Sequence, residues 1–207
     1  MMGYCQRIPY VANAAGYYRA IDDMPWSVWL DSGGIGRYDI LCAQPIATLI
    51  TAGDNTSTTI AGSIKQSRED PFELIRSCLG KSLQSMPDIP FAGGALGYWG
   101  YALTHKQFLK RFPGKTAGQG IDMAIGIYDW AIVIDHLEKA AWLASHQRDQ
   151  STNRLLEEIH ARLTSVRQPP TPCQFMVHGQ IASNFDQHSY IDAVETIKNY
   201  LRNGDCY

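Results

Sequence analysis

The sequence predicts an α+β fold, with mostly antiparallel sheet and about three flanking helices. Two observations support this prediction. Short segments with strand composition dominate the first part of the chain, and three amphipathic segments do not alternate regularly with them. Regular alternation would instead have indicated a doubly wound parallel sheet. The 18 glycines and 10 prolines in 207 residues also favour many short elements joined by turns.

Most of the expected strands are rich in β-branched and aromatic residues and are bounded by turn formers. In the first part of the chain they are residues 26–30, 37–43 and 46–51, with 58–64 as a weaker candidate. Pro45 separates the second strand from the third, because proline cannot donate to a strand ladder. A long apolar segment, 122–135, is expected to pair with 140–146 as a hairpin through residues 137–139.

The sequence PFAGGALGYWGY lies between these two groups of strands and contains Gly93, Gly94, Gly97 and Gly100. Its spacing does not match GxGxxG, and no Lys-Ser/Thr follows as in a phosphate-binding loop. We therefore expect a packed strand in which glycines allow another backbone to approach closely.

Three segments have apolar residues at helical spacing. The first begins at Asp70, which is expected to cap it, with a proline in the first turn and Glu73 at capping-box spacing. The second covers about residues 151–166 and the third about 187–203. Gly204 is a natural end for the third helix.

The composition excludes several classes of protein. Charged residues make up only 18% of the chain, and 18 basic against 20 acidic residues give a net charge of −2 without any basic run. These features argue against binding to nucleic acid or to an anionic membrane surface. No apolar segment is long enough to span a membrane, and the first residues lack the layout of a signal peptide. We therefore expect a cytoplasmic protein.

The cysteines and histidines show no spacing typical of a metal site. Five cysteines are widely spread without a CxxC pair, which favours reduced thiols over disulfides or zinc ligation. The six histidines include no HExxH pair, and no GxSxG nucleophile elbow is present. His136 and His146 fall at facing ends of the expected hairpin, where a surface role is more common than metal ligation. We assign no catalytic residue and no metal ligand.

The segment LDSGGIGRYDI, residues 30–40, is the most informative local feature. It joins two expected strands by a loop that contains Ser32, three glycines and Arg37. An arginine beside an aromatic residue can clamp a carboxylate while the ring stacks on an apolar group, which suits an amino-acid ligand. It can also form an ion pair with a local acid such as Asp39, and the residues alone favour this second interpretation.

Four motifs in order along nearly the whole chain resemble one family. They are LDSGG..GRYDI, FAGGALGYWGY, IDMAIGIYDWAIVIDH and YLRNGDCY. The sequence resembles the N-terminal portion of component I of the chorismate-utilising enzymes, which include aminodeoxychorismate synthase (para-aminobenzoate synthase) and anthranilate synthase. GDCY is normally followed in this family by QVNL, and here the sequence stops at Tyr207, so we expect it to be a piece of a longer protein.

The resemblance implies a division of the chain. Residues 1–167 would form the N-terminal domain of the anthranilate synthase component I type, and 168–185 would be a linker that includes the proline-rich QPPTPC. Residues 186–207 would begin a truncated chorismate-binding domain.

The resemblance also implies an activity for the full-length protein. It would convert chorismate plus ammonia to 4-amino-4-deoxychorismate, for para-aminobenzoate and folate synthesis. The ammonia would come from a separate glutamine amidotransferase subunit, component II. Mg would bind near the chorismate carboxylate, on residues that this chain does not include. This chain alone is expected to be inactive.

In this family the N-terminal portion holds a tryptophan pocket, lined in part from the catalytic portion. Carried onto this sequence, its motif implies a tryptophan-binding role for Ser32, Gly36, Arg37 and Tyr38. The resemblance thus favours a ligand contact for Arg37, in contrast to the residues alone. Asp31 would place a carboxylate near the ammonium group of the ligand.

Two other interpretations stay open. The chain can be a fragment of anthranilate synthase component I, although RYDILCAQP and YDWAIVIDH favour the para-aminobenzoate branch. It can also be a free-standing tryptophan-binding module. An exposed apolar surface, expected where part of a core is missing, counts against the module.

Overall fold

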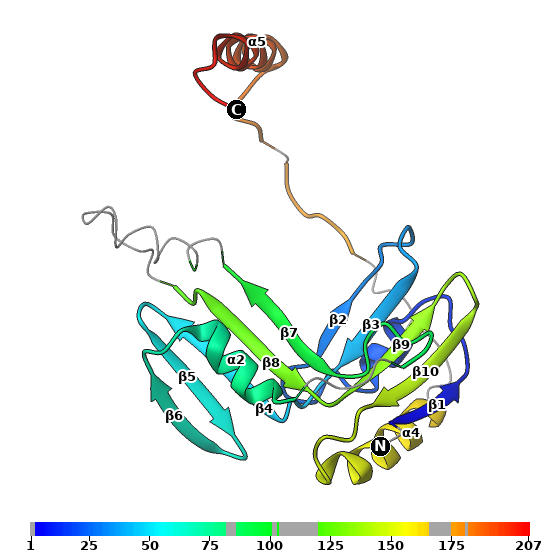
Figure 1. Ribbon diagram of the computed structural model, residues 1–207. Helices are drawn as coiled ribbons and strands as arrows, with labels where there is room; N and C mark the ends of the chain where they lie inside the picture. Colours follow the sequence, from blue (N-terminus) through cyan, green and yellow to red (C-terminus); the bar gives the residue numbers. More distant parts are fainter. Residues whose placement is uncertain (1–2, 82–85, 101–102, 104–119, 166–174, 181) are drawn as a thin grey trace. The chain divides into compact units, whose positions relative to one another are not determined.

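The computed structural model describes residues 3–81, 86–100, 103, 120–165, 175–180 and 182–207. These residues form two five-stranded antiparallel sheets and the helices α1, α2, α4 and α5 (Figure 1). The chain divides into two compact units, Met1–Pro170 and Thr171–Tyr207. Both sheets lie in the first unit, and α5 lies in the second. The predicted α+β class with antiparallel pairing is confirmed.

The first sheet combines strands from the two ends of the first unit. Its order is β1 (Tyr4–Ile8), β10 (Ala140–Ser145), β9 (Trp130–Asp135), β3 (Tyr38–Cys42) and β2 (Val28–Leu30). The predicted hairpin is confirmed, because β9 pairs with β10 and Ala140 lies opposite Asp135. Strand β1 was not predicted. It is only five residues long, and its partner β10 lies far along the chain.

The second sheet has the order β6 (Ser63–Ser67), β5 (Asn55–Ile60), β4 (Ala47–Ala52), β8 (Met123–Tyr128) and β7 (Gly94–Trp99). The expected strand over 58–64 is wrong, because the chain turns there and forms the β5–β6 hairpin. Ala61 and Gly62, at φ 47° and 79°, provide that turn. The left-handed conformation at both positions ends β5.

The long apolar segment 122–135 was predicted as one strand, and this is also wrong. It forms β8 in the second sheet and β9 in the first, with Asp129 between them. Nearly every residue of both strands is buried. An alternating pattern is therefore absent, and the sequence gives little sign of where one strand ends.

The glycine-rich strand β7 is packed as expected. It pairs with β8, and Gly97 lies opposite Ile125. A Cβ atom on Gly97 would lie 2.1 Å from the carbonyl oxygen of Ala124, and the φ of Gly97 is +155°. Only glycine allows this approach without displacing the neighbouring strand.

Helices cover one face of each sheet. Figure 1 shows α4 (Ser151–Ser165) along β1 and β10, and α2 (Pro71–Leu79) across the second sheet. Leu156, Ile159 and Leu163 of α4 join Tyr17 of α1 (Ala15–Arg19) in the core of the first sheet. Ile75 of α2 packs on the second. Neither the five-residue α1 nor its buried Tyr17 was predicted.

The predicted helix ends are mostly confirmed. Asp70 caps α2 by accepting a hydrogen bond from the backbone of Phe72, but Glu73 pairs with Arg76 in place of closing a capping box. The third predicted helix is α5 (Gln187–Asn203), which ends at left-handed Gly204. Its N-terminus carries a full capping box between Asp186 and Ser189.

Several expectations lie outside the described residues. They concern His105, Cys173, the C-terminal end of the second helix at Val166 and the proline-rich segment 168–173. No helix in the described ranges is long and apolar enough to cross a membrane.

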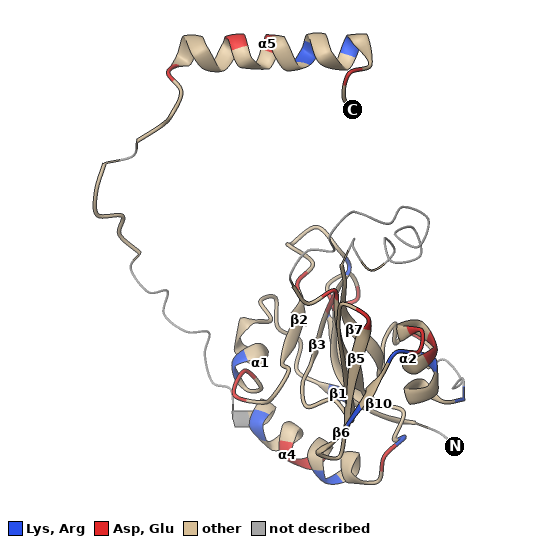
Figure 2. Ribbon diagram, turned by 90° about the vertical axis from the view of Figure 1, so that its left-hand side faces the viewer, with Lys and Arg blue, Asp and Glu red and all other residues tan. Residues whose placement is uncertain are grey.

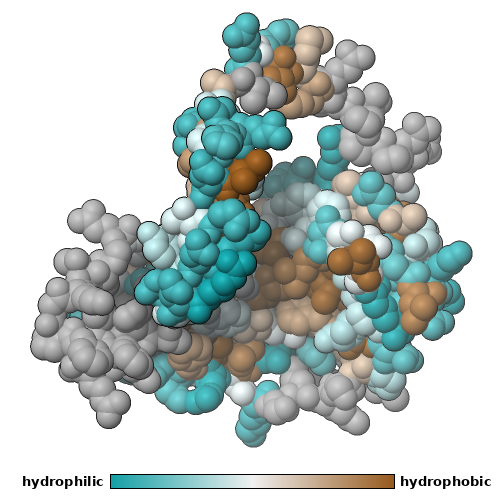
Figure 3. All heavy atoms as spheres, turned by 90° about the horizontal axis from the view of Figure 1, so that it is seen from above, coloured by the Kyte–Doolittle hydropathy of each residue, from teal (hydrophilic) through white to brown (hydrophobic). Residues whose placement is uncertain are grey.

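Charges on the surface are mixed. Figure 2 shows basic and acidic residues interspersed on α2 and α4. In the view of Figure 3, hydrophilic and hydrophobic residues are both exposed. Among the described residues, this mixed distribution agrees with the nearly balanced composition.

Asp129 joins the two sheets to the start of α4. Its carboxylate accepts hydrogen bonds from the backbone N–H groups of Arg148 and Asp149, both at 3.0 Å, and from the Thr152 hydroxyl at 2.7 Å. Asp129 is 1% exposed. One buried carboxylate thus fixes the segment that leads from β10 into α4.

We expect Asp129→Asn to lower the free energy of unfolding by about 1–3 kcal/mol, because the amide nitrogen cannot accept and leaves a buried donor unpaired. Urea denaturation followed by tryptophan fluorescence measures the change. Asp54→Asn, in the exposed β4–β5 turn, is the matched control and should be nearly neutral. Equal stability of the two variants would contradict this role for Asp129.

Candidate functional site

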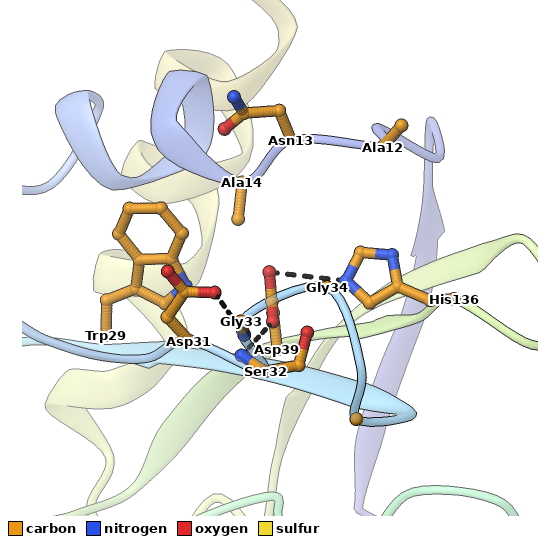
Figure 4. A pocket seen from close by; sticks show the side chains of 11 residues that line it. Ala12, Asn13, Ala14, Trp29, Asp31, Ser32, Gly33, Gly34, Asp39 and His136 are labelled. Atoms are coloured by element: carbon orange, nitrogen blue, oxygen red, sulfur yellow. Dashed lines mark hydrogen bonds and ion pairs between the residues drawn. The ribbon is translucent and has the colours of Figure 1, made fainter.

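A cavity of about 590 Å³ lies at one side of the first sheet, where four segments meet. Its walls are the turn before α1, strand β2 at Trp29, the loop between β2 and β3, and the turn between β9 and β10. Figure 4 shows the side chains that line it. They are Ala12, Asn13, Ala14, Trp29, Asp31, Ser32, Gly33, Gly34, Gly36, Asp39 and His136.

The β2–β3 loop is tied back on itself. The carbonyl oxygen of Ser32 accepts from the N–H groups of Ile35 at 3.3 Å and Gly36 at 3.1 Å. The Asp31 carboxylate accepts from the Gly33 N–H at 2.8 Å. Gly33 and Gly34 have φ values of 63° and 74°, a conformation that strongly favours glycine. Local hydrogen bonds therefore shape this wall of the cavity.

Asp39 connects the loop to the rest of the cavity. It is 3% exposed, and its Oδ1 accepts from the backbone N–H of Ser32 at 2.7 Å. Its Oδ2 lies 3.2 Å from Nε2 of His136. Burial on its own would raise the pKa of Asp39, but hydrogen bonds from Ser32 and His136 outweigh it and lower that pKa below its ordinary value. The side chain is therefore a buried carboxylate at neutral pH.

His136 is engaged at both ring nitrogens. Its Nδ1 lies 3.2 Å from the hydroxyl oxygen of Tyr10, and its Nε2 faces Asp39. Neither nitrogen is left to take a proton from the hydroxyl of Ser32. The cavity therefore does not contain a Ser-His-Asp catalytic triad, although all three residue types are present.

Arg37 forms an ion pair with Asp135 instead of the expected local partner Asp39. Its Nε and Nη2 donate to Oδ2 of Asp135 at 3.0 and 2.7 Å. Asp135 is 1% exposed and also accepts from the N–H groups of Leu137 and Glu138. The hydrogen bond from Arg37 lowers the pKa of Asp135 below its usual value, together with those backbone bonds.

The four residues that the sequence singled out are divided between two places. Ser32 and Gly36 line the cavity, whereas Arg37 and Tyr38 are not among its lining residues. The guanidinium carbon of Arg37 lies 4.8 Å from the centre of the Tyr38 ring, and Tyr38 packs on the core beneath the first sheet. The structure thus places Arg37 between Asp135 and Tyr38.

Sequence reasoning missed Trp29, Asp39 and His136 as members of one site. Trp29 lies at the cavity with its indole nitrogen buried and without a hydrogen-bond partner among the described residues. Asp39 had been considered only as a partner for Arg37. The sole signal in the sequence was that His136 follows a strand end in DH, which does not indicate what it faces.

Within the described ranges, no three His, Cys, Asp or Glu side chains come together in a way that could hold a metal ion. The acidic residues at the cavity, Asp31 and Asp39, are each used by backbone N–H groups. These residues do not fit a magnesium site, so no metal-dependent step is assigned to them.

Comparison with known proteins places most of the chain in one family. A family profile described as chorismate binding enzyme matches residues 27–207. The chain is 32% identical to aminodeoxychorismate synthase component 1 of Klebsiella aerogenes, over 97% of the chain and 44% of that protein. It is 33% identical to the protein of the same name from Salmonella typhimurium, again over 97% and 44%.

The chain therefore spans less than half the length of these curated relatives. Among solved structures, anthranilate synthase component I from Streptococcus pneumoniae is similar over 86% of this chain and 41% of that one. The TM-score is 0.47 and the sequence identity is 23%.

We expect the contribution of the Arg37–Asp135 pair to stability to depend on pH. Because the folded-state pKa of Asp135 is lowered, its stabilisation is fully present above the unfolded pKa of about 4 and is lost as the pH falls through the folded pKa. Arg37→Gln should therefore be less stable than wild type at pH 7, and the difference should shrink below about pH 4. Urea denaturation of both proteins at pH 7 and below about pH 4 measures the difference in the free energy of unfolding. A difference that is independent of pH would show that the pair is not its source.

Proposed function

The chain belongs to the chorismate binding enzyme family, and from this membership we propose that it forms the N-terminal portion of an aminodeoxychorismate synthase component 1 subunit. The observation that supports this proposal is identity of 32–33% to two proteins of that name along 97% of the chain. The motifs RYDILCAQP and YDWAIVIDH also favour aminodeoxychorismate synthase over anthranilate synthase.

In this proposal the whole subunit replaces the ring hydroxyl of chorismate by an amino group. The product is 4-amino-4-deoxychorismate, the precursor of para-aminobenzoate and folate. A glutamine amidotransferase, component II, supplies the ammonia, and the complex works in the cytoplasm. We assign no catalytic residue to the described part of the chain. Mg and its ligands would belong to the part of the subunit that corresponds to the remaining length of the relatives.

We further propose that the cavity at the first sheet is one half of a tryptophan pocket. Its size suits an amino acid with a large side chain, and it combines the ring of Trp29 with polar groups of the β2–β3 loop. The buried indole N–H of Trp29 lacks an acceptor that a ligand can provide. Ser32 and Gly36 would contact the ligand directly. Arg37 and Tyr38 would act by holding the start of β3, because the guanidinium is bound to Asp135.

The alternative is a fragment of anthranilate synthase component I, which shares the family. The two proposals differ in the product formed from chorismate. A free-standing tryptophan-binding module is the remaining alternative, and it predicts that the native protein forms neither product.

We expect the native protein, purified with its amidotransferase, to convert chorismate and glutamine to 4-amino-4-deoxychorismate. Chromatography after addition of the lyase should then detect para-aminobenzoate. Anthranilate formed without the lyase would favour the alternative, and the absence of both products would contradict the enzymatic proposal. The 207-residue chain by itself should give no product in the same assay, and measurable turnover by it would show that these residues contain catalytic groups.

We expect Gly36→Val to weaken binding of L-tryptophan at least tenfold. A Cβ atom on Gly36 would lie 3.1 Å from Cβ of Ser32, so a branched side chain must push the loop into the cavity or out of place. Titration followed by the indole N–H resonance of Trp29 measures the affinity. Gly120→Val is the control, because a Cβ atom there meets nothing within 4 Å. Unchanged affinity in Gly36→Val would remove Gly36 from the proposed pocket.

A further inference from the structure

Three groups that line the cavity and the nearby Tyr10 form one continuous chain of hydrogen bonds. It runs from the Tyr10 hydroxyl through the two nitrogens of His136 to the two oxygens of Asp39, and ends at the backbone N–H of Ser32. We propose that Asp39 is the positioning residue of this cavity, which acts through Ser32 and His136 to hold the ligand-facing loop in its binding conformation. The inference rests on the proposed function for the identity of the ligand.

The direction of the hydrogen bonds follows from the chemistry of the groups. A carboxylate only accepts, so Nε2 of His136 must carry the hydrogen that faces Asp39. In the neutral ring Nδ1 is then an acceptor, and it takes the hydrogen of the Tyr10 hydroxyl. The structure thus assigns the Nε2–H tautomer to His136. This tautomer depends on the charge of Asp39 and is a direct sign that the chain of hydrogen bonds is intact.

The chain of hydrogen bonds joins three walls of the cavity. Tyr10 precedes the turn at 12–14, Ser32 lies in the β2–β3 loop, and His136 is the first residue of the β9–β10 turn. In Figure 4 Asp39 lies between the loop and His136, with a dashed line to each. The backbone of His136 is anchored as well, since its N–H donates to the carbonyl oxygen of Arg37 at 2.8 Å. No other carboxylate that lines the cavity contacts two of its walls.

The buried charge of Asp39 lies beside the hydrophobic core of the first sheet, which includes the neighbouring Leu41. An ionised carboxylate is costly to bury unless it is paired, and here each oxygen is used to hold a different wall. The arrangement therefore favours a role in fixing the geometry of the cavity.

Asp122 provides a matched control in the other sheet. It is 6% exposed, against 3% for Asp39, and its carboxylate also accepts from a backbone N–H, that of Gly53, at 2.9 Å. Asp39→Asn and Asp122→Asn thus make the same chemical change at two similarly buried carboxylates. Only the first lies at the cavity.

The test uses the 207-residue chain labelled with ¹⁵N. Long-range ¹H–¹⁵N spectra report which nitrogen of His136 carries hydrogen, amide spectra report the loop, and L-tryptophan is titrated against the Trp29 indole signal. In Asp39→Asn the side-chain oxygen still accepts the hydrogen bond from the Ser32 N–H. The side-chain NH₂ group then faces Nε2 of His136, which must accept. We therefore expect the His136 hydrogen to move to Nδ1, the amides of residues 32–34 to shift, and the affinity to fall at least tenfold. Asp122→Asn should change none of these.

An affinity within twofold of wild type in Asp39→Asn, or an equal loss in Asp122→Asn, would overturn the proposal. The 207-residue chain contains only one half of the proposed pocket, so if it does not bind L-tryptophan, the ligand-free spectra decide about Asp39. An unchanged tautomer and unchanged loop amides would then overturn it, whereas the expected changes would support it.

A second pair of variants covers the case in which Asp39→Asn does not fold. His136→Gln keeps a donor toward Asp39 and should retain affinity within about threefold, whereas His136→Leu removes it and should lose at least tenfold. Equal behaviour of the two would contradict a positioning role that acts through His136.

Discussion

The architecture depends on one continuous buried segment that belongs to both sheets. Strand β8 pairs with β4 and β7, and strand β9 pairs with β3 and β10, with Asp129 as the single residue between them. Since the segment is covalently continuous, an inner strand of one sheet leads directly into an inner strand of the other. The hydrogen bonds of Asp129 extend this constraint to α4, which covers the first sheet. The cavity depends on the same segment, because β3, which pairs with β9, supplies Asp39 and the β9–β10 turn supplies His136.

Local signals in the sequence were sufficient for most of the fold. The capping residues and helix-ending residues were enough to predict α2 and α5. The residue composition of the strands was enough to predict β3, β4 and the β9–β10 hairpin. The two errors among the strands have different physical origins. Residues 122–135 are apolar throughout because both strands are buried, so periodicity cannot reveal the crossing at Asp129. Residues 58–64 contain a turn formed by Ala61 and Gly62, and an alanine in the left-handed conformation gives no warning in the sequence.

The candidate site was less accessible to such reasoning than the fold. The β2–β3 loop could be identified because its glycines and Ser32 are adjacent in the sequence. Its partners could not, because Tyr10 and His136 are 126 residues apart. They meet through the pairing of β1 with β10 and of β10 with β9. Arg37 illustrates the converse. The residues alone favour an ion pair with a local acid such as Asp39, whereas the register of β3 against β9 gives Arg37 the partner Asp135.

The shared segment β8–β9 also has a consequence for how the chain folds as it is synthesised. All strands from β1 to β7 leave the ribosome before β8 and β9, which each sheet needs as an inner strand. The strands made earlier therefore expose apolar faces and unpaired edges. Contacts of such high sequence separation slow folding, because loop closure precedes any gain from pairing. The nascent protein is thus most exposed to aggregation before residue 135 emerges, and chaperone binding in that interval would protect it.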